Sequence, residues 1–395
     1  MERYHSLDKL RASMMLLGVW LHTVVGYSRE GGWPYKDPNP TAVFDWTLAL
    51  IHTFRMPLFM AVAGFFGALL WERRGSREFV SNRVRRIALP FLIGWLAVFP
   101  PSMLMAAYSK TGQVSAAIGF FTTGAFVRYL HPGHLWFLEY LLVIYAIAYA
   151  VVKIAGRLPD ALLAAANAAY RTVLAGRWRA VLFAIPSAGT FSLMRGGFLE
   201  DPPGFVPVPR IVLAYLVPFF FGWLLYLNRD LLPALERGAW THLLLAGVLF
   251  TTWMVAAEPH LQGLGSAGRY ARAGAGALGL WFITFGLTGL FLRHAASERA
   301  LWRYLSDGSY WMYVVHMPVV MAFQIALAAV PIPTEAKVLV VVVASFLALV
   351  ASYDLVARRS WIGAMLNGRR YPRRYFVRHA PELEAPSLAV AGPRS

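Results

Sequence analysis

The sequence predicts an all-α membrane protein, a polytopic bundle of about ten transmembrane helices with the N and C termini both cytoplasmic. Of its 395 residues 58% are hydrophobic and only 14% are charged, whereas soluble domains carry roughly 25% charged residues. Apolar stretches that are long enough to cross a bilayer, which takes about 20 residues per helix, recur along most of the chain with short gaps. The pattern therefore indicates a membrane domain without a separate soluble domain.

Ten apolar stretches are the expected membrane spans. In chain order they cover residues 8–28, 44–71, 87–108, 134–155, 178–196, 210–228, 239–257, 272–293, 308–330 and 336–357. The less apolar stretches 113–130 and 160–175 predict interfacial helices, and the Pro-rich stretches 33–40 and 202–209 predict loops. We expect a single transmembrane domain over residues 1–360 and a basic cytoplasmic tail over residues 361–395.

The distribution of Lys and Arg orients these spans. If the ten spans alternate, 27 of the 37 basic residues fall on the side that holds both termini, nine fall on the other side and Arg55 lies inside the second span. Cytoplasmic loops carry the excess of Lys and Arg in membrane proteins. The sequence therefore predicts cytoplasmic termini and a multi-pass protein of the bacterial inner membrane.

Composition also limits the partners. The net charge of +17 comes from basic residues that flank apolar spans, which indicates membrane lipids and no nucleic acid as partner. The chain has no cysteine, so disulfides, thiolate metal sites and a cysteine nucleophile are excluded. No HExxH, Gly-x-Ser-x-Gly or phosphate-cradling glycine motif occurs, and we expect no metal. The sequence is compatible with a homo-oligomer but does not fix the oligomeric state.

The first span carries ionisable residues at both ends. Arg11 and His22 are eleven residues apart, so they share nearly one helix face and lie about 16 Å apart along the axis. Ionisable groups inside a bilayer are costly and mark functional sites by default. The alternatives are that Arg11 anchors the helix at the cytoplasmic side and that His22 is a hydrogen-bonded packing residue.

The second span contains a cation that cannot easily reach the membrane surface. His52 and Arg55 are one turn apart on this span, and Arg55 needs a carboxylate, a carbonyl or an anionic substrate as partner. Gly64 and Gly67 follow on the same span, and they predict close helix contacts.

Six arginines lie between the second and third spans, from residue 73 to residue 86. They are either topology anchors that bind anionic lipid or a phosphate clamp, for which the guanidinium fork is well suited. Arg83 and Arg86 are three residues apart at the mouth of the third span, so they can point the same way.

Two later spans add polar residues. The fourth span begins with His134 and places Glu139 about one turn inside the membrane. In the ninth span Tyr313 lies one turn before His316, which falls mid-membrane. His316 either joins a polar cluster with His22 or bridges helices, and the histidines at 131 and 134 either bind substrate or belong to an interfacial loop.

These residues resemble a known family. The run from Ser6 to Ala12 that leads to His22 is similar to the opening motif of the acyltransferase 3 family, in which ten residues separate a basic residue from a histidine. The stretches 51–56, 63–66 and 134–138 resemble more narrowly its glucans biosynthesis protein C branch, and the stretch 309–316 is similar to a late Ser-Tyr…Tyr…His element of the family. The resemblance extends from the first to the tenth span.

The resemblance implies transfer of an acyl group from cytoplasmic acyl-coenzyme A, with succinyl-coenzyme A or acetyl-coenzyme A as donor, to a hydroxyl of an extracytoplasmic glucan or other glycan. A neutral imidazole can deprotonate the attacking hydroxyl, and a nearby cation can stabilise the oxyanion. The expected residues are, for catalysis, His22, Arg11, His316 and Glu139; for substrate binding, Arg55, His52, His134 and Tyr313; and for donor phosphates, Arg83 and Arg86.

Two other function classes remain open from the residues alone. A secondary transporter or flippase for an anionic or sugar substrate would also use buried Arg and His, although no internal repeat is evident. A non-catalytic membrane assembly factor is the other alternative. Consumption of acyl-coenzyme A by the purified protein distinguishes an enzyme from both.

Overall fold

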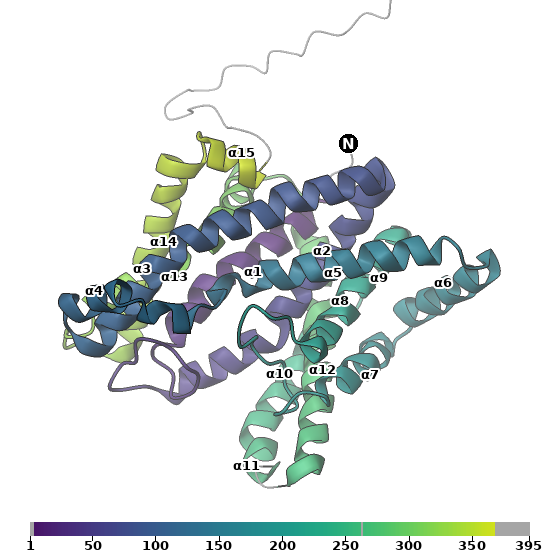
Figure 1. Ribbon diagram of the computed structural model, residues 1–395. Coiled ribbons are helices and arrows are strands. Elements are labelled where there is room, and N and C mark those ends of the chain that lie inside the picture. Colours follow the sequence, from purple (N-terminus) through teal and green to yellow (C-terminus); the bar gives the residue numbers. More distant parts are fainter. Residues whose placement is uncertain (1–3, 262–263, 368–395) are drawn as a thin grey trace, which may run out of the picture.

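The structure, a computed structural model, describes residues 4–261 and 264–367, and every regular element within these ranges is helical (Figure 1). The longer helices are α1 (His5–Val24), α2 (Ala42–Arg83), α3 (Leu89–Thr111), α5 (Trp136–Ala155), α6 (Asp160–Ala175), α7 (Arg179–Phe191), α8 (Pro209–Leu227), α10 (Ala239–Thr252), α12 (Gly265–His294), α13 (Ala300–Ala326) and α14 (Thr334–Ser352). The shorter helices are α4 (Val114–Thr122), α9 (Leu232–Glu236), α11 (Glu258–Leu261) and α15 (Trp361–Asn367). Single 3₁₀ or π turns cover η1 (Val84–Ala88), η2 (Ala125–Tyr129), η3 (Gly133–Leu135), η4 (Arg229–Leu231), η5 (Trp253–Ala257) and η6 (Tyr353–Ala357).

Six stretches of the described chain are long and apolar enough to cross a membrane. They are Ala42–Thr111, Ala125–Ala155, Pro209–Leu227, Ala239–Ala257, Gly265–His294 and Thr334–Ala357. The first stretch has 70 residues and contains both α2 and α3. The predicted all-α class is confirmed, and the chain is a polytopic membrane protein.

Each of the ten predicted spans coincides with a helix or with part of one. The helices α1 and α13 fall outside the six apolar stretches; α1 carries the charged residues Asp8, Lys9 and Arg11 at its start. The fifth predicted span is shorter than expected, because α7 has only 13 residues. That length gives about 20 Å, which is less than the roughly 30 Å of a hydrocarbon core. The two predicted interfacial stretches contain α4 and α6.

The arginine-rich stretch between the second and third spans is helical rather than a loop. The helix α2 reverses direction at Gly75, where φ is +72°. Glycine adopts this backbone conformation without the steric cost that a side chain would add. The chain then continues as a helix through η1 into α3, so α2 and α3 form a hairpin with its tip at Gly75 (Figure 1).

Glycines bring α2 and α8 into close contact at the centre of the bundle. A Cβ atom on Gly64 would lie 1.9 Å from the carbonyl oxygen of Phe219, and one on Gly222 would lie 1.7 Å from that of Ala61. No side chain fits at either position. The predicted close contacts of Gly64 are therefore confirmed, and Gly67 faces the rings of Tyr145 and Trp223.

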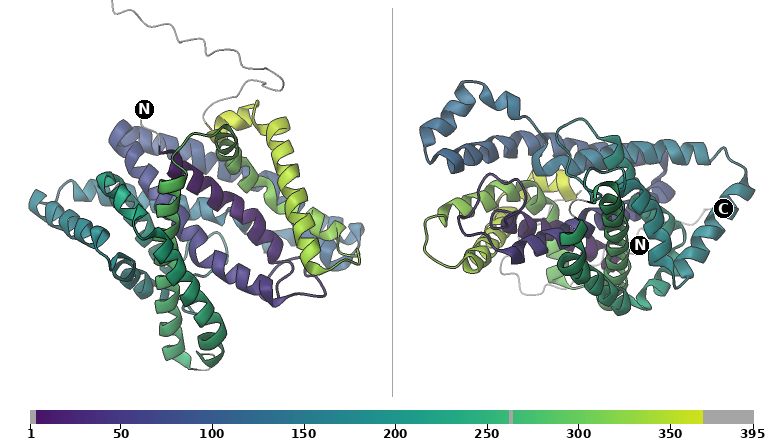
Figure 2. Two further views of the ribbon diagram at one scale, coloured as in Figure 1. Left: turned by 180° about the vertical axis from the view of Figure 1, so that it is seen from behind. Right: turned by 90° about the horizontal axis from the view of Figure 1, so that it is seen from below.

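The remaining helices surround this pair. The helix α1 packs against α2 and α13, and α13 in turn packs against α3 and α14. The helices α10 and α12 lie side by side, and together they extend away from the other helices in Figure 1 and in the left view of Figure 2.

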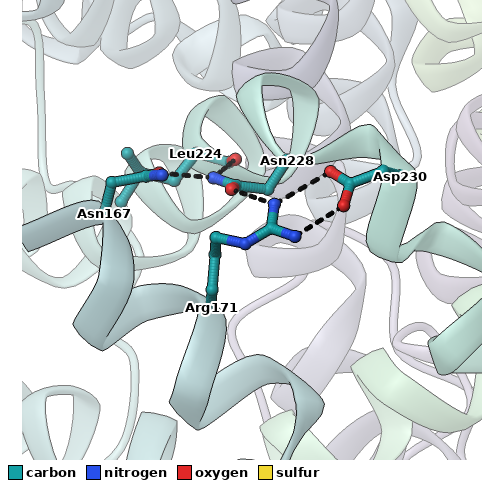
Figure 3. Close-up of polar contacts among 5 residues, drawn as sticks. All are labelled: Asn167, Arg171, Leu224, Asn228 and Asp230. Carbon is teal, nitrogen blue, oxygen red and sulfur yellow. Dashed lines mark hydrogen bonds and ion pairs between the residues drawn. The ribbon is translucent and has the colours of Figure 1, made fainter. Parts of the chain in front are cut away.

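A polar network fixes α6 to the end of α8 (Figure 3). Arg171 donates two hydrogen bonds to the carboxylate of Asp230, at 3.0 and 2.7 Å, and another to Oδ1 of Asn228 at 2.9 Å. Asn228 donates from Nδ2 to Oδ1 of Asn167 at 2.7 Å and to the carbonyl of Leu224 at 3.0 Å. The network joins a surface helix to the turn that follows a membrane span.

The C-terminal part of the described chain packs back onto the bundle. Nη1 of Arg86 donates to the carbonyls of Ala364 and Met365, each at 3.0 Å, and Leu366 is buried. The start of α1 and the helix α15 lie at the same end of the molecule (Figure 1). The predicted tail over residues 361–395 thus begins with a packed helix, and its residues 368–395 lie outside the described residues.

Candidate active site

Three histidine rings from three separate elements meet inside the bundle. They are His22 near the end of α1, His134 in η3 before α5, and His316 in the middle of α13. The ring centroids are 5.0 Å apart for His22 and His316, 4.7 Å for His134 and His316, and 6.3 Å for His22 and His134. We call these residues the histidine cluster.

Backbone carbonyls orient two of the rings. Nε2 of His134 donates to the carbonyl of Val314 at 2.9 Å, and Nδ1 of His316 donates to the carbonyl of Tyr313 at 2.7 Å. A neutral His316 therefore presents Nε2 as an acceptor, and this atom is buried without a hydrogen-bond partner. Nδ1 of His22 is also buried without a partner. Buried polar atoms are normally paired, so these two nitrogens are candidates for contact with a substrate.

Arg55 brings a positive charge to the cluster from α2. Its side chain is 8% exposed, and its Nε atom is buried without a hydrogen-bond partner. The guanidinium lies against Gly18 of α1, where an added Cβ atom would approach Nη1 to 2.5 Å. The absence of a side chain at Gly18 therefore lets Arg55 reach across to α1, one helical turn before His22.

The loop between α1 and α2 covers the cluster. Trp33 stacks on His22 with ring centroids 5.2 Å apart and planes at 25°. Its indole N–H donates to Oε1 of Gln324 at 2.9 Å, and Nε2 of Gln324 donates to the carbonyl of Thr23 at 3.0 Å. Gln324 is fully buried and so links the loop, α1 and α13 around His22.

A buried ion pair holds the same loop to α14. Lys337 donates to Oδ2 of Asp37 at 2.9 Å, and both side chains are almost completely buried. Burial alone would raise the pKa of the Asp37 carboxyl. The hydrogen bonds from Lys337, from the backbone of Asn39 and from Tyr35 outweigh that effect and hold the pKa below its ordinary value.

A cavity of about 1250 Å³ opens on the other side of the cluster, at the end of the molecule where α1 begins and α15 packs. Its polar lining includes Arg11, Arg73, Arg74, Asn82, Arg83, Arg86, Ser306, Asp307, Ser309, Tyr310 and Asn367. The volume exceeds the 300–1,000 Å³ that is common for small-ligand pockets. Most of its charged lining residues are arginines, a composition that suits a large anionic ligand.

The arginines of this cavity differ in their bonding. Nε and Nη2 of Arg83 are buried without hydrogen-bond partners, and its guanidinium lies 4.1 Å from the centroid of the Tyr145 ring. Arg86 already donates to the end of α15. Arg11 forms an ion pair with Asp8 at 3.2 Å and lies over the ring of Phe66. Arg83 thus keeps two buried donor atoms free for an added phosphate.

The other predicted site residues lie around the cluster or apart from it. Tyr313 donates to the carbonyl of His134 at 2.8 Å. Nε2 of His52 lies 3.3 Å from the carbonyl of Leu199 and 3.9 Å from Asp201, so it faces the loop after α7. Glu139 is half-buried, and its Oε2 atom has no hydrogen-bond partner. It lies off the face of α5 that carries the cavity-lining residues, so a catalytic role for it stays a prediction.

Some residues of this region were not predicted as site residues. Trp33 lies in a predicted loop, Gln324 is an isolated amide in an apolar span, and Gly18 precedes His22 by one turn. The amide was the available signal, because a polar side chain inside a membrane needs a partner. Within the described residues, no three His, Cys, Asp or Glu side chains are arranged to hold a metal ion.

Comparisons with known proteins agree with this arrangement. The model of the acyltransferase 3 family, described as an acyltransferase domain, matches residues 4–357. The chain is 25% identical over 335 residues to glucans biosynthesis protein C of Escherichia coli O139:H28 (strain E24377A / ETEC), which covers 82% of this chain and 83% of that protein. The protein of the same name from Escherichia coli (strain SMS-3-5 / SECEC) is 25% identical over 332 residues, with the same shares covered. No solved structure matches the chain.

Proposed function

Because the chain belongs to the acyltransferase 3 family, we propose that it moves a succinyl or acetyl group from cytoplasmic acyl-coenzyme A to a hydroxyl of an extracytoplasmic glucan or other glycan. The observation that carries this proposal is the arginine-lined cavity that ends below a cluster of three histidines and a buried arginine. The relatives named above concern glucans, which supports a glucan as the acceptor.

The proposed topology places the enzyme in the bacterial inner membrane with about ten membrane spans and cytoplasmic termini. The 27-to-9 distribution of basic residues supports this orientation. The cavity then opens to the cytoplasm, where acyl-coenzyme A is found, and the loop that carries Trp33 lies on the outer side, where the glycan is found. The histidine cluster lies between the two.

The proposed chemistry is a single acyl transfer. His22 takes the proton from the acceptor hydroxyl while its oxygen attacks the thioester carbonyl. Arg55 stabilises the negative charge on the tetrahedral oxyanion, or holds the carboxylate of a succinyl group. The carbon–sulfur bond then breaks, the proton passes to the coenzyme A thiolate, and the acceptor carries the new ester. His316 and His134 orient His22 and the acceptor.

The test is an assay of the purified protein in lipid vesicles. We expect succinyl-coenzyme A or acetyl-coenzyme A to be consumed only when a glucan is present, and mass spectrometry should find the acyl ester on the glucan. Transport of the glycan without consumption of the thioester would instead indicate a transporter. Glycans from cells with and without the protein identify the natural acceptor.

Arg83 provides a sharper test of the donor site. Arg83→Gln is expected to raise the KM for acyl-coenzyme A about tenfold, with a smaller effect on kcat, because a charged hydrogen bond contributes roughly 1.5–3 kcal/mol. Arg74→Gln, a mostly exposed arginine at the rim of the same cavity, is the matched control and should change KM less. Equal KM values for wild type and Arg83→Gln would mean that Arg83 does not bind the donor and serves only as a topology anchor.

A further inference from the structure

The arginine-lined cavity stops one layer of side chains below the histidine cluster. On α2 Phe59 lines the cavity, and Arg55 lies one turn further on. On α5 Phe137 lines it, and His134 precedes Phe137 by one turn. Neither Arg55 nor His134 is itself among the described residues that line the cavity. One turn is about 5.4 Å, so a single layer separates the cavity from the cluster on both helices.

On the other two helices the cavity also ends on this side of the cluster, at a larger distance along the chain. On α1 Met15 lines the cavity two turns before His22, and on α13 Tyr310 lines it nearly two turns before His316. Four helices therefore carry cavity-lining residues on the same side of the cluster. The cavity thus points toward the histidines and is closed just below them.

Two phenylalanine rings form this closing layer. The rings of Phe59 and Phe137 meet edge to face, with centroids 4.7 Å apart and planes at 82°. Phe137 also lies 6.4 Å from the ring of Tyr313, which adjoins the cluster. The side chains of Phe59 and Phe137 are 6% and 2% exposed. Edge-to-face pairs are favourable contacts, and both rings are buried, so this layer is apolar and closely packed.

We propose that Phe59 and Phe137 form a gate through which the acyl thioester passes from the cavity to the histidine cluster, and that the two rings limit the size of the acyl group. The passage of an acyl group rests on the proposed function, whereas the closure of the cavity does not. Rotation of either ring opens a path along the axis of the cavity. The closed gate keeps cytoplasmic water from the histidines, which protects a thioester from hydrolysis.

Thiol labelling tests the gate without any acyl transfer, because the chain has no cysteine of its own. A cysteine in place of His316 should react slowly with a membrane-impermeant thiol reagent that is added to the side on which the cavity opens. Phe59→Ala or Phe137→Ala should then speed the reaction roughly 10- to 1,000-fold, since a closed site opens through a minor state populated at about 0.1–10%.

Two controls make this result specific. Phe66→Ala removes another ring from the wall of the same cavity and should leave the labelling rate of the His316→Cys thiol unchanged. Asn82→Cys, which lines the cavity near the arginines, should react quickly with or without the gate variants. Phe59→Leu and Phe137→Leu replace the Ala variants if those do not fold. An unchanged rate at His316→Cys in every folded gate variant would overturn the proposal.

Donor selectivity tests the role in passage. In chains that keep His316, Phe59→Ala should raise the ratio of hexanoyl to acetyl transfer about tenfold or more, because one methylene group alone changes selectivity about 10- to 200-fold. Phe66→Ala should leave this ratio as in wild type. An unchanged ratio in Phe59→Ala would overturn the size limit. If the wild-type protein consumes no acyl-coenzyme A, the proposed function fails, and the labelling result still decides whether the rings close the cavity.

Discussion

His22 and His316 each have a buried ring nitrogen without a hydrogen-bond partner, and their rings are in contact. An imidazole with an unused acceptor nitrogen can take a proton from a hydroxyl, and general-base catalysis contributes typically 10²–10⁴-fold. We predict that His22→Ala lowers kcat by about that factor while the protein still inserts and binds the donor. His316→Ala should have a milder effect, because its Nδ1 bond to Tyr313 suits an orienting role.

Steady-state kinetics and donor-binding measurements on both purified variants check this prediction. His242→Ala is the matched control, since His242 is a half-buried histidine on α10 that bonds the carbonyl of Gly238 and packs against Phe282 and Phe285, outside the histidine cluster. A loss of activity that follows only the loss of folded protein would make His22 a packing residue. A larger loss for His316→Ala than for His22→Ala would assign the general base to His316.

Gly18 allows the role of Arg55 to be tested without removing its charge. A Cβ atom at residue 18 would lie 2.5 Å from Nη1 of Arg55, and the flexible guanidinium would move aside. We predict that Gly18→Ala lowers kcat by about 10- to 100-fold, since removal of one oxyanion donor costs roughly 10²–10³-fold. Arg55→Gln should lower it further.

The measurement is kcat with succinyl-coenzyme A and with acetyl-coenzyme A, and insertion is checked by yield. Gly279→Ala, where an added Cβ atom has only an ordinary 3.7 Å contact, is the control. If both donors lose rate equally, Arg55 stabilises the oxyanion rather than a succinyl carboxylate. A fully active Gly18→Ala protein would remove Arg55 from the reaction.

The sequence identified the ionisable residues of the site, but it did not identify the apolar residues that surround them. His22, His134, His316 and Arg55 stood out because an ionisable side chain in an apolar span is costly. Apolar residues are expected throughout a membrane span, so nothing in the sequence distinguished Phe59, Phe137 and Met15. Only the packing of four helices places these apolar residues between the cavity and the histidines.

At the scale of elements, apolar length predicted where helices lie but not how they end. The stretch from Arg73 to Arg86 was expected to connect two spans and is instead helical on both sides of Gly75. Hydropathy falls where arginines gather, yet arginine is a good helix former. The span expected at residues 178–196 shortened to the 13 residues of α7.

The loop between α1 and α2 is held in place by the buried pair of Asp37 and Lys337. Removal of one partner of a buried ion pair costs about 3–5 kcal/mol, because the other charge stays buried and unpaired. We predict that Lys337→Met lowers the thermal unfolding temperature in detergent, and that it also loosens Trp33 from His22. The double variant Asp37→Asn with Lys337→Met should recover part of the stability.

This pair also gives a pH dependence with a defined sign. The folded-state pKa of Asp37 is lowered, so its contribution to stability is present above the unfolded pKa of about 3.9 and is lost as pH falls through the folded pKa. Wild type should therefore keep this contribution down to about pH 4, and the Asp37→Asn chain should lack it. Identical acid unfolding of wild type and Asp37→Asn would contradict the assignment.

At the scale of the whole molecule, we predict that Ala42 and the turn at Gly75 lie on opposite sides of the membrane. From Ala42 to the turn at Gly75 the helix runs for about 50 Å, well beyond the roughly 30 Å of the hydrocarbon core. The basic residues then decide which end is cytoplasmic. Arginines gather on both sides of Gly75, and the loop before α2 has few basic residues, so the turn at Gly75 is expected in the cytoplasm.

Single cysteines in this cysteine-free chain test that orientation. Gly32 is exposed, and an added Cβ atom there meets nothing within 4 Å; Ser76 follows the turn of the α2 hairpin. We predict that a membrane-impermeant thiol reagent modifies Gly32→Cys in intact spheroplasts and Ser76→Cys only after the membrane is opened. Modification of Ser76→Cys from outside would show that the orientation is the reverse of the predicted one. The arginine-lined cavity would then open away from the cytoplasmic pool of acyl-coenzyme A. Each variant carries a single cysteine. Labelling of Gly32→Cys under the same conditions is therefore the control that the reagent reaches the outer surface.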